Sequence, residues 1–222
     1  MNSELQARLK VVENRINAAV IRAGRRREDI TLVAVTKVFP ASVIRDAYEL
    51  GVREFGENYV QEFEGKAGHV KDLPGARFHL IGHLQSNKAK RGSELFDVVQ
   101  TVDTPRLAQK LDAAGKPMDV FIEVKLSREQ AKQGCDVDDL PELVEAVRNC
   151  RNLALQGLMT MPPWSDDSER SRPYFRQLAE LARPHEIWGL SMGMSHDFEV
   201  AIEEGATHIR VGTALFGRRA KQ

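Results

Sequence analysis

The sequence lacks the marks of a disulfide framework, a cysteine-based metal site and a membrane span. It contains only 2 cysteines in 222 residues, Cys135 and Cys150, and they show no metal-ligand spacing. No stretch approaches the roughly 18 apolar residues that a membrane span needs. Because the first residues lack an apolar core behind a basic flank, we expect no signal peptide. These absences predict a soluble, cytoplasmic protein in a reducing compartment, without a membrane partner.

The chain also lacks net charge. Lys+Arg and Asp+Glu are equal at 32 each, so the formal net charge is zero. A protein that binds nucleic acid through phosphate attraction needs a basic surface. The one arginine cluster, residues 25–27, is followed at once by Glu28 and Asp29, which is typical of a solvated helix end. We therefore expect no nucleic-acid partner.

Helical and strand-like patterns alternate along the chain. Apolar residues at three- and four-residue steps predict an amphipathic helix over residues 3–23, with Gly24 as its stop. We expect strands at residues 31–36, 54–56, 78–81, 98–102, 120–124, 154–159, 186–190 and 208–211. Helices are expected at residues 41–50, 104–114, 138–150, 168–183 and 195–204.

This alternation predicts the fold class. About eight β-α units in roughly 200 residues favour an α/β protein built as a single closed (β/α)8 TIM barrel. We expect residues 1–222 to form one domain, with a helix in residues 1–24 packing on the barrel. An open doubly wound sheet is the alternative, because periodicity does not establish closure. In a barrel, the catalytic mouth would hold Lys37, Asn58, His83, Met159 and the loops around Ser191 and Gly212.

Lys37 is the first candidate functional residue. It follows the apolar run of residues 31–36, and Val38 and Pro40 then end the strand pattern. The end of a first strand is where α/β folds hold their chemistry. Partial burial there lowers the pKa of a lysine and prepares its amine to form a Schiff base with an aldehyde. The alternative is a strand-end lysine whose amine simply extends to solvent.

Two turns near the C-terminus suit a phosphate. The Ser191–Ser195 segment is expected to follow a strand and open a helix, with Ser195 as N-cap and as a hydroxyl donor to a phosphate. Gly212 and Thr213 follow the last strand and supply backbone N–H groups and a hydroxyl. In TIM barrels the loops after strands seven and eight commonly form a shared phosphate site. An ordinary helix cap after a glycine turn is the alternative for Ser195.

Arg210 precedes this last turn and is expected inside the barrel, where an arginine needs a partner. It would either pair with a carboxylate such as Glu123 or donate to the ring nitrogen of a heteroaromatic ligand. In the second role it would leave that nitrogen unprotonated, because arginine does not readily release a proton. Such a ring is a weaker electron sink for carbanions.

Asn58 and His83 follow the second and third expected strands. Asn58 would cap the next helix or present its amide to a ligand. His79 and His83 are four residues apart, but Gly82 between them argues against the helical geometry of a metal pair. The sequence also lacks a nucleophile elbow, a dinucleotide fingerprint after the first strand and a P-loop.

Taken together, these segments resemble the pyridoxal-phosphate homeostasis proteins, a family similar to the N-terminal domain of alanine racemase. The resemblance covers nearly the whole chain and is carried by residues 32–37, 55–62, 79–88, 157–161, 190–195 and 210–217. It implies a fold-type III barrel that binds pyridoxal 5′-phosphate (PLP). It further implies that the PLP site contains Lys37 as the Schiff-base lysine, Ser195, Gly212 and Thr213 at the phosphate, Arg210 at the pyridine nitrogen, and Asn58 and His83 in the pocket wall.

The resemblance also implies a role. Members are regarded as PLP carriers or regulators of the vitamin B6 pool and of amino-acid balance, without established catalysis. Their partners would be PLP and PLP-dependent apo-enzymes, and a monomer is expected. Lys132 matches a family lysine linked to a secondary PLP contact. The chain departs from the usual family pattern at Val38 and Phe39, where many members carry threonine and then a second basic or polar residue.

Two other functions compete with a non-catalytic PLP protein. One is a minimal fold-type III enzyme such as an amino-acid racemase, with Lys37 as its single base. A racemase usually takes a second acid/base tyrosine from an additional domain, and here only Tyr59 is expected near the mouth. The other is a barrel that binds a sugar phosphate without PLP.

Overall fold

Eight parallel strands close into a barrel in a computed structural model that describes residues 3–127 and 133–217. Each strand pairs with its neighbour in sequence, and β1 closes the ring by pairing with β8. The strands are β1 (Thr31–Val35), β2 (Glu54–Glu57), β3 (Arg77–Leu80), β4 (Val98–Val102), β5 (Met118–Glu123), β6 (Leu153–Met159), β7 (Gly189–Met194) and β8 (His208–Val211). The predicted (β/α)8 barrel is therefore confirmed, and the open sheet is excluded.

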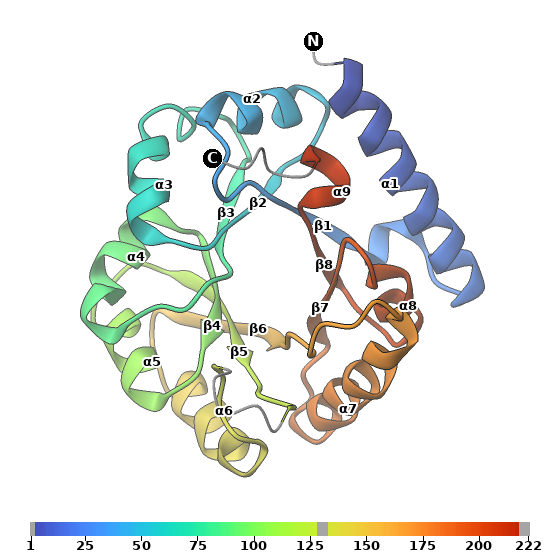
Figure 1. Ribbon diagram of the computed structural model, residues 1–222. Helices are drawn as coiled ribbons and strands as arrows, with labels where there is room; N and C mark the ends of the chain where they lie inside the picture. Colours follow the sequence, from blue (N-terminus) through green and yellow to red (C-terminus); the bar gives the residue numbers. More distant parts are fainter. Residues whose placement is uncertain (1–2, 128–132, 218–222) are drawn as a thin grey trace.

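Helices form a ring around the strands, as Figure 1 shows. They are α1 (Ser3–Arg22), α2 (Ala41–Glu49), α3 (Val60–Ala67), α4 (Ala89–Leu95), α5 (Pro105–Asp112), α6 (Leu140–Arg148), α7 (Arg172–Ala182), α8 (Phe198–Glu203) and α9 (Thr213–Phe216). Short 3-10 turns occupy Arg27–Asp29, Ser86–Lys88, Val137–Asp139, Ser168–Ser171 and Arg183–His185. The predicted N-terminal helix is confirmed as α1, which packs on α8 and α9.

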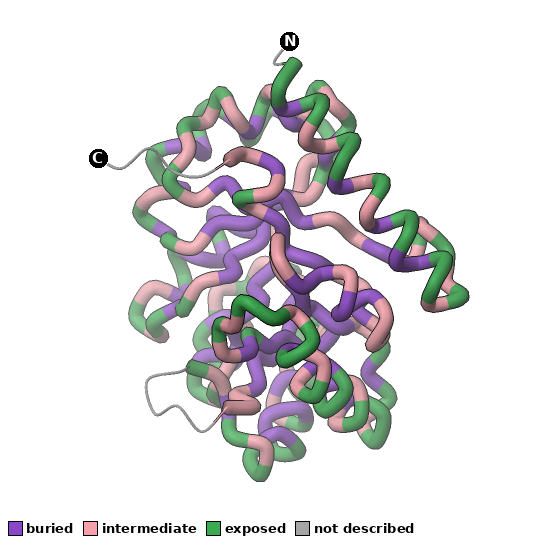
Figure 2. Tube along the Cα trace, turned by 45° about the vertical axis from the view of Figure 1, so that its right-hand side comes forward, coloured by how far each residue is buried: buried purple, intermediate pink, exposed green. Residues whose placement is uncertain are grey.

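The main core lies between the strands and the helices. Inward-facing apolar stripes explain it: α1, for example, buries Leu5, Val12, Ile16, Ala19 and Val20 along one face. Figure 2 shows buried residues along the central strands and exposed ones on the outer helices and loops. A second, smaller cluster of Val98, Phe121 and Met159 forms separately from this core, as expected for residues that alternate with the outward-facing ones along each strand.

The predicted boundaries around β7 are wrong. The strand runs over Gly189–Met194 instead of residues 186–190, and α8 starts at Phe198 instead of 195. The Ser-Met-Gly-Met run suggests a turn, but it continues the strand, and the strand begins at a close contact with β6. A Cβ on Gly189 would lie 2.0 Å from the carbonyl oxygen of Gln156. Glycine is therefore required at this contact between β6 and β7.

The shift of β7 places Ser191 inside a strand instead of in a loop at the mouth. Ser191 is fully buried as a residue of β7, and Met159 is fully buried in the cluster with Val98 and Phe121. Ser195 does not act as the N-cap of α8, because that position belongs to Asp197. Asp197 Oδ1 accepts a hydrogen bond from the Met194 N–H at 2.7 Å and so fixes the turn that contains Ser195.

Candidate functional site

Lys37 lies in a tight turn that follows β1. The carbonyl oxygen of Thr36 accepts a hydrogen bond from the Phe39 N–H at 3.1 Å, so Lys37 and Val38 are the central residues of the turn. Lys37 is half-buried, whereas Val38 is exposed. The φ angle of Val38 is 63°, in the left-handed region that a β-branched residue rarely adopts. The turn that carries the lysine is therefore strained, at a cost of roughly 1–3 kcal/mol.

The turn of Lys37 lies beside the loop that follows β8. In the register of these two strands Ala34 pairs with Val211, which brings Val35 next to Gly212. A Cβ on Gly212 would lie 3.4 Å from the carbonyl oxygen of Val35, an ordinary contact distance. The C-terminal ends of β1 and β8 thus bring an amine and a glycine loop to the same side of the mouth.

Ser195 and the loop after β8 meet through hydrogen bonds. Ser195 Oγ accepts the N–H of Gly212 at 3.2 Å and the N–H of Ala214 at 3.2 Å. Thr213 lies between these two residues and is exposed. The two predicted phosphate turns therefore form one cluster of a hydroxyl and backbone N–H groups. Sequence reasoning missed Ala214, which contributes only a backbone group and so leaves no signal in the residue type.

The extra helix α1 also contacts this cluster. Arg15 Nη2 donates to the carbonyl oxygen of Ser195 at 3.2 Å, and its guanidinium pairs with Glu199 at 2.6 Å. The same guanidinium lies 4.3 Å from the ring centroid of Phe198. The N-terminal helix therefore contacts the backbone of the Ser195 turn through Arg15.

Arg210 is buried inside the barrel and bonds to neutral partners. Nη1 donates to Ser191 Oγ at 2.6 Å, and Nη2 donates to the carbonyl oxygen of Thr160 at 2.9 Å. Burial lowers the pKa of Arg210 to about 10, against the opposing attraction of Glu123 and Asp197, so the guanidinium is charged at neutral pH. Among the described residues it forms no ion pair with Glu123. Of the two partners that the sequence left open for Arg210, the carboxylate of Glu123 is therefore excluded.

A chain of hydrogen bonds continues from Ser191 across the barrel. Ser191 donates to Gln100 Oε1 at 2.7 Å, and the amide nitrogen of Gln100 lies 2.8 Å from His79 Nδ1. Because an amide nitrogen only donates, His79 Nδ1 accepts, and Nε2 carries the proton toward Glu54 at 2.5 Å. Each hydrogen bond in this chain is donated in the direction away from Arg210. Ser191 Oγ is therefore fixed as the acceptor of the hydrogen bond from Arg210.

Glu123 carries a buried carboxyl group. It is 3% exposed, and its Oε2 has no hydrogen-bond partner among the described residues. Burial, with repulsion from Asp103, raises the pKa of Glu123 to about 7, although the charge of Arg210 opposes the shift. Glu123 therefore keeps its proton into the neutral range.

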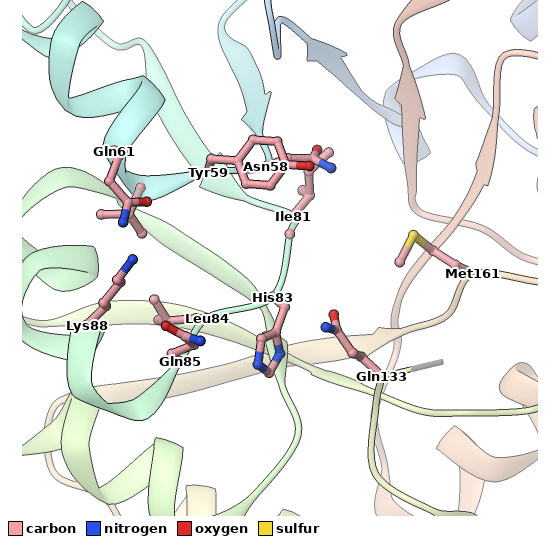
Figure 3. A pocket seen from close by; sticks show the side chains of 12 residues that line it. Asn58, Tyr59, Gln61, Ile81, His83, Leu84, Gln85, Lys88, Gln133 and Met161 are labelled. Carbon is pink, nitrogen blue, oxygen red and sulfur yellow. The ribbon is translucent and has the colours of Figure 1, made fainter. Parts of the chain in front are cut away.

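Asn58 and His83 line one pocket of about 430 Å³. Figure 3 shows them after β2 and β3, with Met161 on the other side of the pocket. The loops of Asn58 and His83 cross closely, since a Cβ on Gly82 would lie 2.1 Å from the carbonyl oxygen of Asn58. Asn58 does not cap α3, whose N-cap is Tyr59, and its buried Oδ1 has no partner among the described residues. His83 is exposed and lies 3.7 Å from Asp103.

The predicted site residues thus fall into two adjoining groups. Lys37, Ser195, Arg210, Gly212 and Thr213 come from the ends of β1, β7 and β8, whereas Asn58 and His83 belong to the pocket after β2 and β3. Lys132 lies outside the described residues. Within the described ranges, no group of three or more His, Cys, Asp and Glu side chains is arranged to hold a metal ion. No helix in the same ranges is long and apolar enough to cross a membrane.

The fold is that of an alanine-racemase-type barrel. The family described as "Alanine racemase, N-terminal domain" matches residues 12–220. The chain is 42% identical over 223 residues to the pyridoxal phosphate homeostasis protein of Pseudomonas aeruginosa, covering 98% of this chain and 96% of that one. It is 41% identical over 229 residues to the protein of the same name from Escherichia coli K12, covering 98% and 97%.

A solved structure agrees with these relatives. PipY of Synechococcus elongatus, solved with PLP bound, superposes with a TM-score of 0.80 at 37% identity, covering 93% of this chain and 100% of PipY. The chain belongs to the pyridoxal phosphate homeostasis protein family. The family predicted from the sequence motifs is therefore confirmed.

Proposed function

We propose that this chain binds PLP through a Schiff base on Lys37 and acts, without turnover, in the homeostasis of PLP and in amino-acid balance. The observation that carries the proposal is the β1–β8 register, which sets the Lys37 turn beside the Gly212 loop. The names of the relatives and the PLP-bound PipY structure support it.

The residues present fit this cofactor. Ser195 Oγ and the N–H groups of Gly212 and Ala214 form a cluster suited to a phosphate, with Thr213 beside it. The guanidinium of Arg210 has more N–H donors than its two bonds use, so it is able to donate to a ring nitrogen. The buried Oδ1 of Asn58 has no partner among the described residues and is an acceptor that a ligand hydroxyl would satisfy.

Lys37 supplies the reacting amine. PLP, when bound, supplies an aldehyde carbon. The unprotonated Nζ of Lys37 adds to that carbon, a C=N bond replaces the C=O bond, and the oxygen leaves as water with both hydrogens of the amine. The bond is reversible, so Lys37 is able to hold and release the cofactor. Apo-enzymes that need PLP are the partners that such a reversible tether suits.

Arg210 supports a holding role over a catalytic one. It remains charged at neutral pH and does not give up a proton to a ring nitrogen. An unprotonated ring stabilises carbanions poorly. The protein therefore lacks, at this position, the acid that would promote amino-acid chemistry.

The racemase alternative has one observation in its favour. The phenol of Tyr59 is exposed and lines the same pocket as Asn58 and His83. A turnover assay with a panel of L- and D-amino acids separates the two functions. We expect rates equal to those of free PLP. A rate that exceeds free PLP and disappears in Tyr59→Phe would overturn the non-catalytic proposal.

PLP titration of the wild-type protein and of Lys37→Ala tests the binding itself. We expect an absorption band of the Schiff base in the wild type and none in Lys37→Ala. A band that persists in Lys37→Ala, or none in either protein, would refute the proposal.

A further inference from the structure

Two glutamates of the segment 56–62 play no part in the proposed PLP contacts, yet both contact the turn of Lys37. Glu57 is the last residue of β2 and is fully buried, and Glu62 lies on α3 one turn before Lys66. We call Glu57, Glu62 and Lys66 the cradle. Its members come from β2 and α3, whereas the turn that they contact follows β1.

Lys66 is the centre of the cradle. Its Nζ lies 2.9 Å and 3.1 Å from the two oxygens of Glu57 and 2.6 Å from Glu62 Oε1. The same Nζ donates to the carbonyl oxygen of Thr36 at 3.0 Å. Lys66 is only 8% exposed, which is rare for a lysine. The buried ammonium is thus satisfied by two carboxylates and by one backbone group of the Lys37 turn.

The carboxylates of Glu57 and Glu62 also form hydrogen bonds with the Lys37 turn. Glu57 Oε1 accepts the hydroxyl of Thr36 at 2.7 Å. Glu62 Oε1 accepts the backbone N–H of Val38. The cradle therefore bonds both residues that flank Lys37: the carbonyl and hydroxyl of the one before it, and the amide of the one after it.

The backbone at this point needs such support. Val38 has a φ of 63° at the turn position where glycine is normally found. Its own preference would turn the backbone away from this conformation and redirect the side chain of Lys37. Burying charged groups for stability alone is a poor strategy, because well-packed apolar residues often serve as well or better. The charges are instead placed where they hold a strained turn.

We propose that Glu57, Glu62 and Lys66 are positioning residues that hold the Lys37 turn in its left-handed geometry and so aim the lysine amine at the aldehyde carbon of PLP. This inference rests on the proposed Schiff base at Lys37. It assigns a role to the Glu-Asn-Tyr-Val-Gln-Glu segment that direct cofactor contacts leave unexplained.

Glu62→Ala is the test variant, because it removes the acceptor of the Val38 N–H. The matched control is Glu64→Ala on the same helix, whose carboxylate pairs with Arg91 at the surface. Glu62→Gln keeps an acceptor for Val38 and guards against failure of the alanine variant to fold. The readouts are the rate of the Schiff-base absorption after addition of PLP, the affinity for pyridoxine 5′-phosphate, which has no aldehyde, and amide hydrogen exchange at Val38 in the ligand-free protein.

We expect Glu62→Ala to form the Schiff base at least about tenfold more slowly, since misplacement of a reacting group by about 1 Å is that costly. Its affinity for pyridoxine 5′-phosphate should stay within about twofold of wild type, and exchange at Val38 should accelerate, because only the aim of the amine and its turn have changed. Glu62→Gln should recover most of the rate, and Glu64→Ala should behave as wild type.

A wild-type rate in Glu62→Ala would overturn the positioning role. Equal losses for PLP and pyridoxine 5′-phosphate would overturn it too, since they indicate general damage to the pocket. If the wild-type protein forms no Schiff base, the proposed function fails instead. Hydrogen exchange at Val38 then still decides whether the cradle holds the turn: unchanged exchange in Glu62→Ala rejects it.

Discussion

Arg210 Nη1 lies 2.6 Å from Ser191 Oγ, so the buried guanidinium is oriented by a neutral hydroxyl and not by a carboxylate. The hydroxyl of Ser191 in turn donates its proton to Gln100 Oε1, so the lone pairs of the Ser191 oxygen face Arg210. The positive charge of Arg210 is therefore not neutralised by a direct ion pair with Glu123. Among the described residues the guanidinium is instead bonded to two neutral oxygens, Ser191 Oγ and the carbonyl oxygen of Thr160.

Removal of the Ser191 hydroxyl should destabilise the protein. Ser191→Ala leaves Arg210 Nη1 and Gln100 Oε1 without their partners inside the barrel. We expect a loss of about 1–3 kcal/mol in the free energy of unfolding, measured by urea denaturation. The control is Ser165→Ala, because the hydroxyl oxygen of Ser165 accepts a hydrogen bond from the exposed N–H of Asp167 and takes no part in the chain inside the barrel. Equal stabilities of the two variants would show that the hydrogen-bond chain carries no net stabilisation.

Ser195→Ala should weaken binding of PLP but not of pyridoxal, which has no phosphate. The hydroxyl of Ser195 is where the N–H groups of Gly212 and Ala214 converge. Loss of a hydrogen bond to a charged group is worth about 1.5–3 kcal/mol, or roughly ten- to hundredfold in affinity. Titration calorimetry with both ligands measures the difference. A parallel loss for pyridoxal would place Ser195 away from the phosphate.

The N-terminal helix should affect the same ligand contact through Arg15. Arg15→Met removes the bond to the Ser195 carbonyl as well as the ion pair with Glu199. Arg22→Met is the matched control, because it removes a comparable ion pair between α1 and Glu203 of α8 without reaching Ser195. We expect several-fold weaker PLP binding in Arg15→Met only. The same change in both variants would assign the effect to general loosening of α1.

Glu123 should make stability fall as the pH rises through the mildly acidic range. Its pKa is about 7 in the folded protein against an ordinary value of 4.5, mainly because of burial. Between these two values the unfolded chain has released the proton that the folded chain still binds. The contribution of Glu123 to the free energy of unfolding is therefore fully present below pH 4.5. It is lost as the pH rises toward 7, by on the order of 3 kcal/mol.

Glu123→Gln tests this, since glutamine does not ionise. Relative to wild type, the variant should gain stability at pH 8 but not at pH 4, in thermal or urea unfolding. The buried His208, whose pKa is lowered to about 4 mainly by burial, is unchanged in both proteins, and its effect cancels in the comparison. A stability difference that is independent of pH would show that folding does not raise the pKa of Glu123.

Much of the fold could be predicted from local patterns. The sequence predicts the strand before Lys37 at residues 31–36, and the structure has it at Thr31–Val35. The strand predicted at residues 98–102 is found at Val98–Val102. Such segments have apolar runs and turn residues that indicate their structure without reference to the rest of the chain. The strand at Gly189–Met194 does not, because Gly189 is required by a close contact with β6, which is visible only in the three-dimensional structure.

The site could be predicted only in part for the same reason. Ser195, Gly212 and Thr213 stand in turns whose chemistry is visible in their residue types, and the structure joins two of them through one hydroxyl. The hydrogen bonds that join Glu57 and Lys66 to Thr36 bring together residues from three separate segments of the chain. A pairing of this kind leaves no periodic signal in one sequence.

The central claim is that Lys37 carries the cofactor, and borohydride reduction tests it most directly. Reduction of the PLP-loaded protein converts the reversible C=N bond into a stable amine, and mass spectrometry of the peptides locates the label. We predict one labelled residue, Lys37, at one PLP per chain, and no label at that position in Lys37→Ala. Stoichiometric label on another lysine, with Lys37 unmodified, would contradict the account.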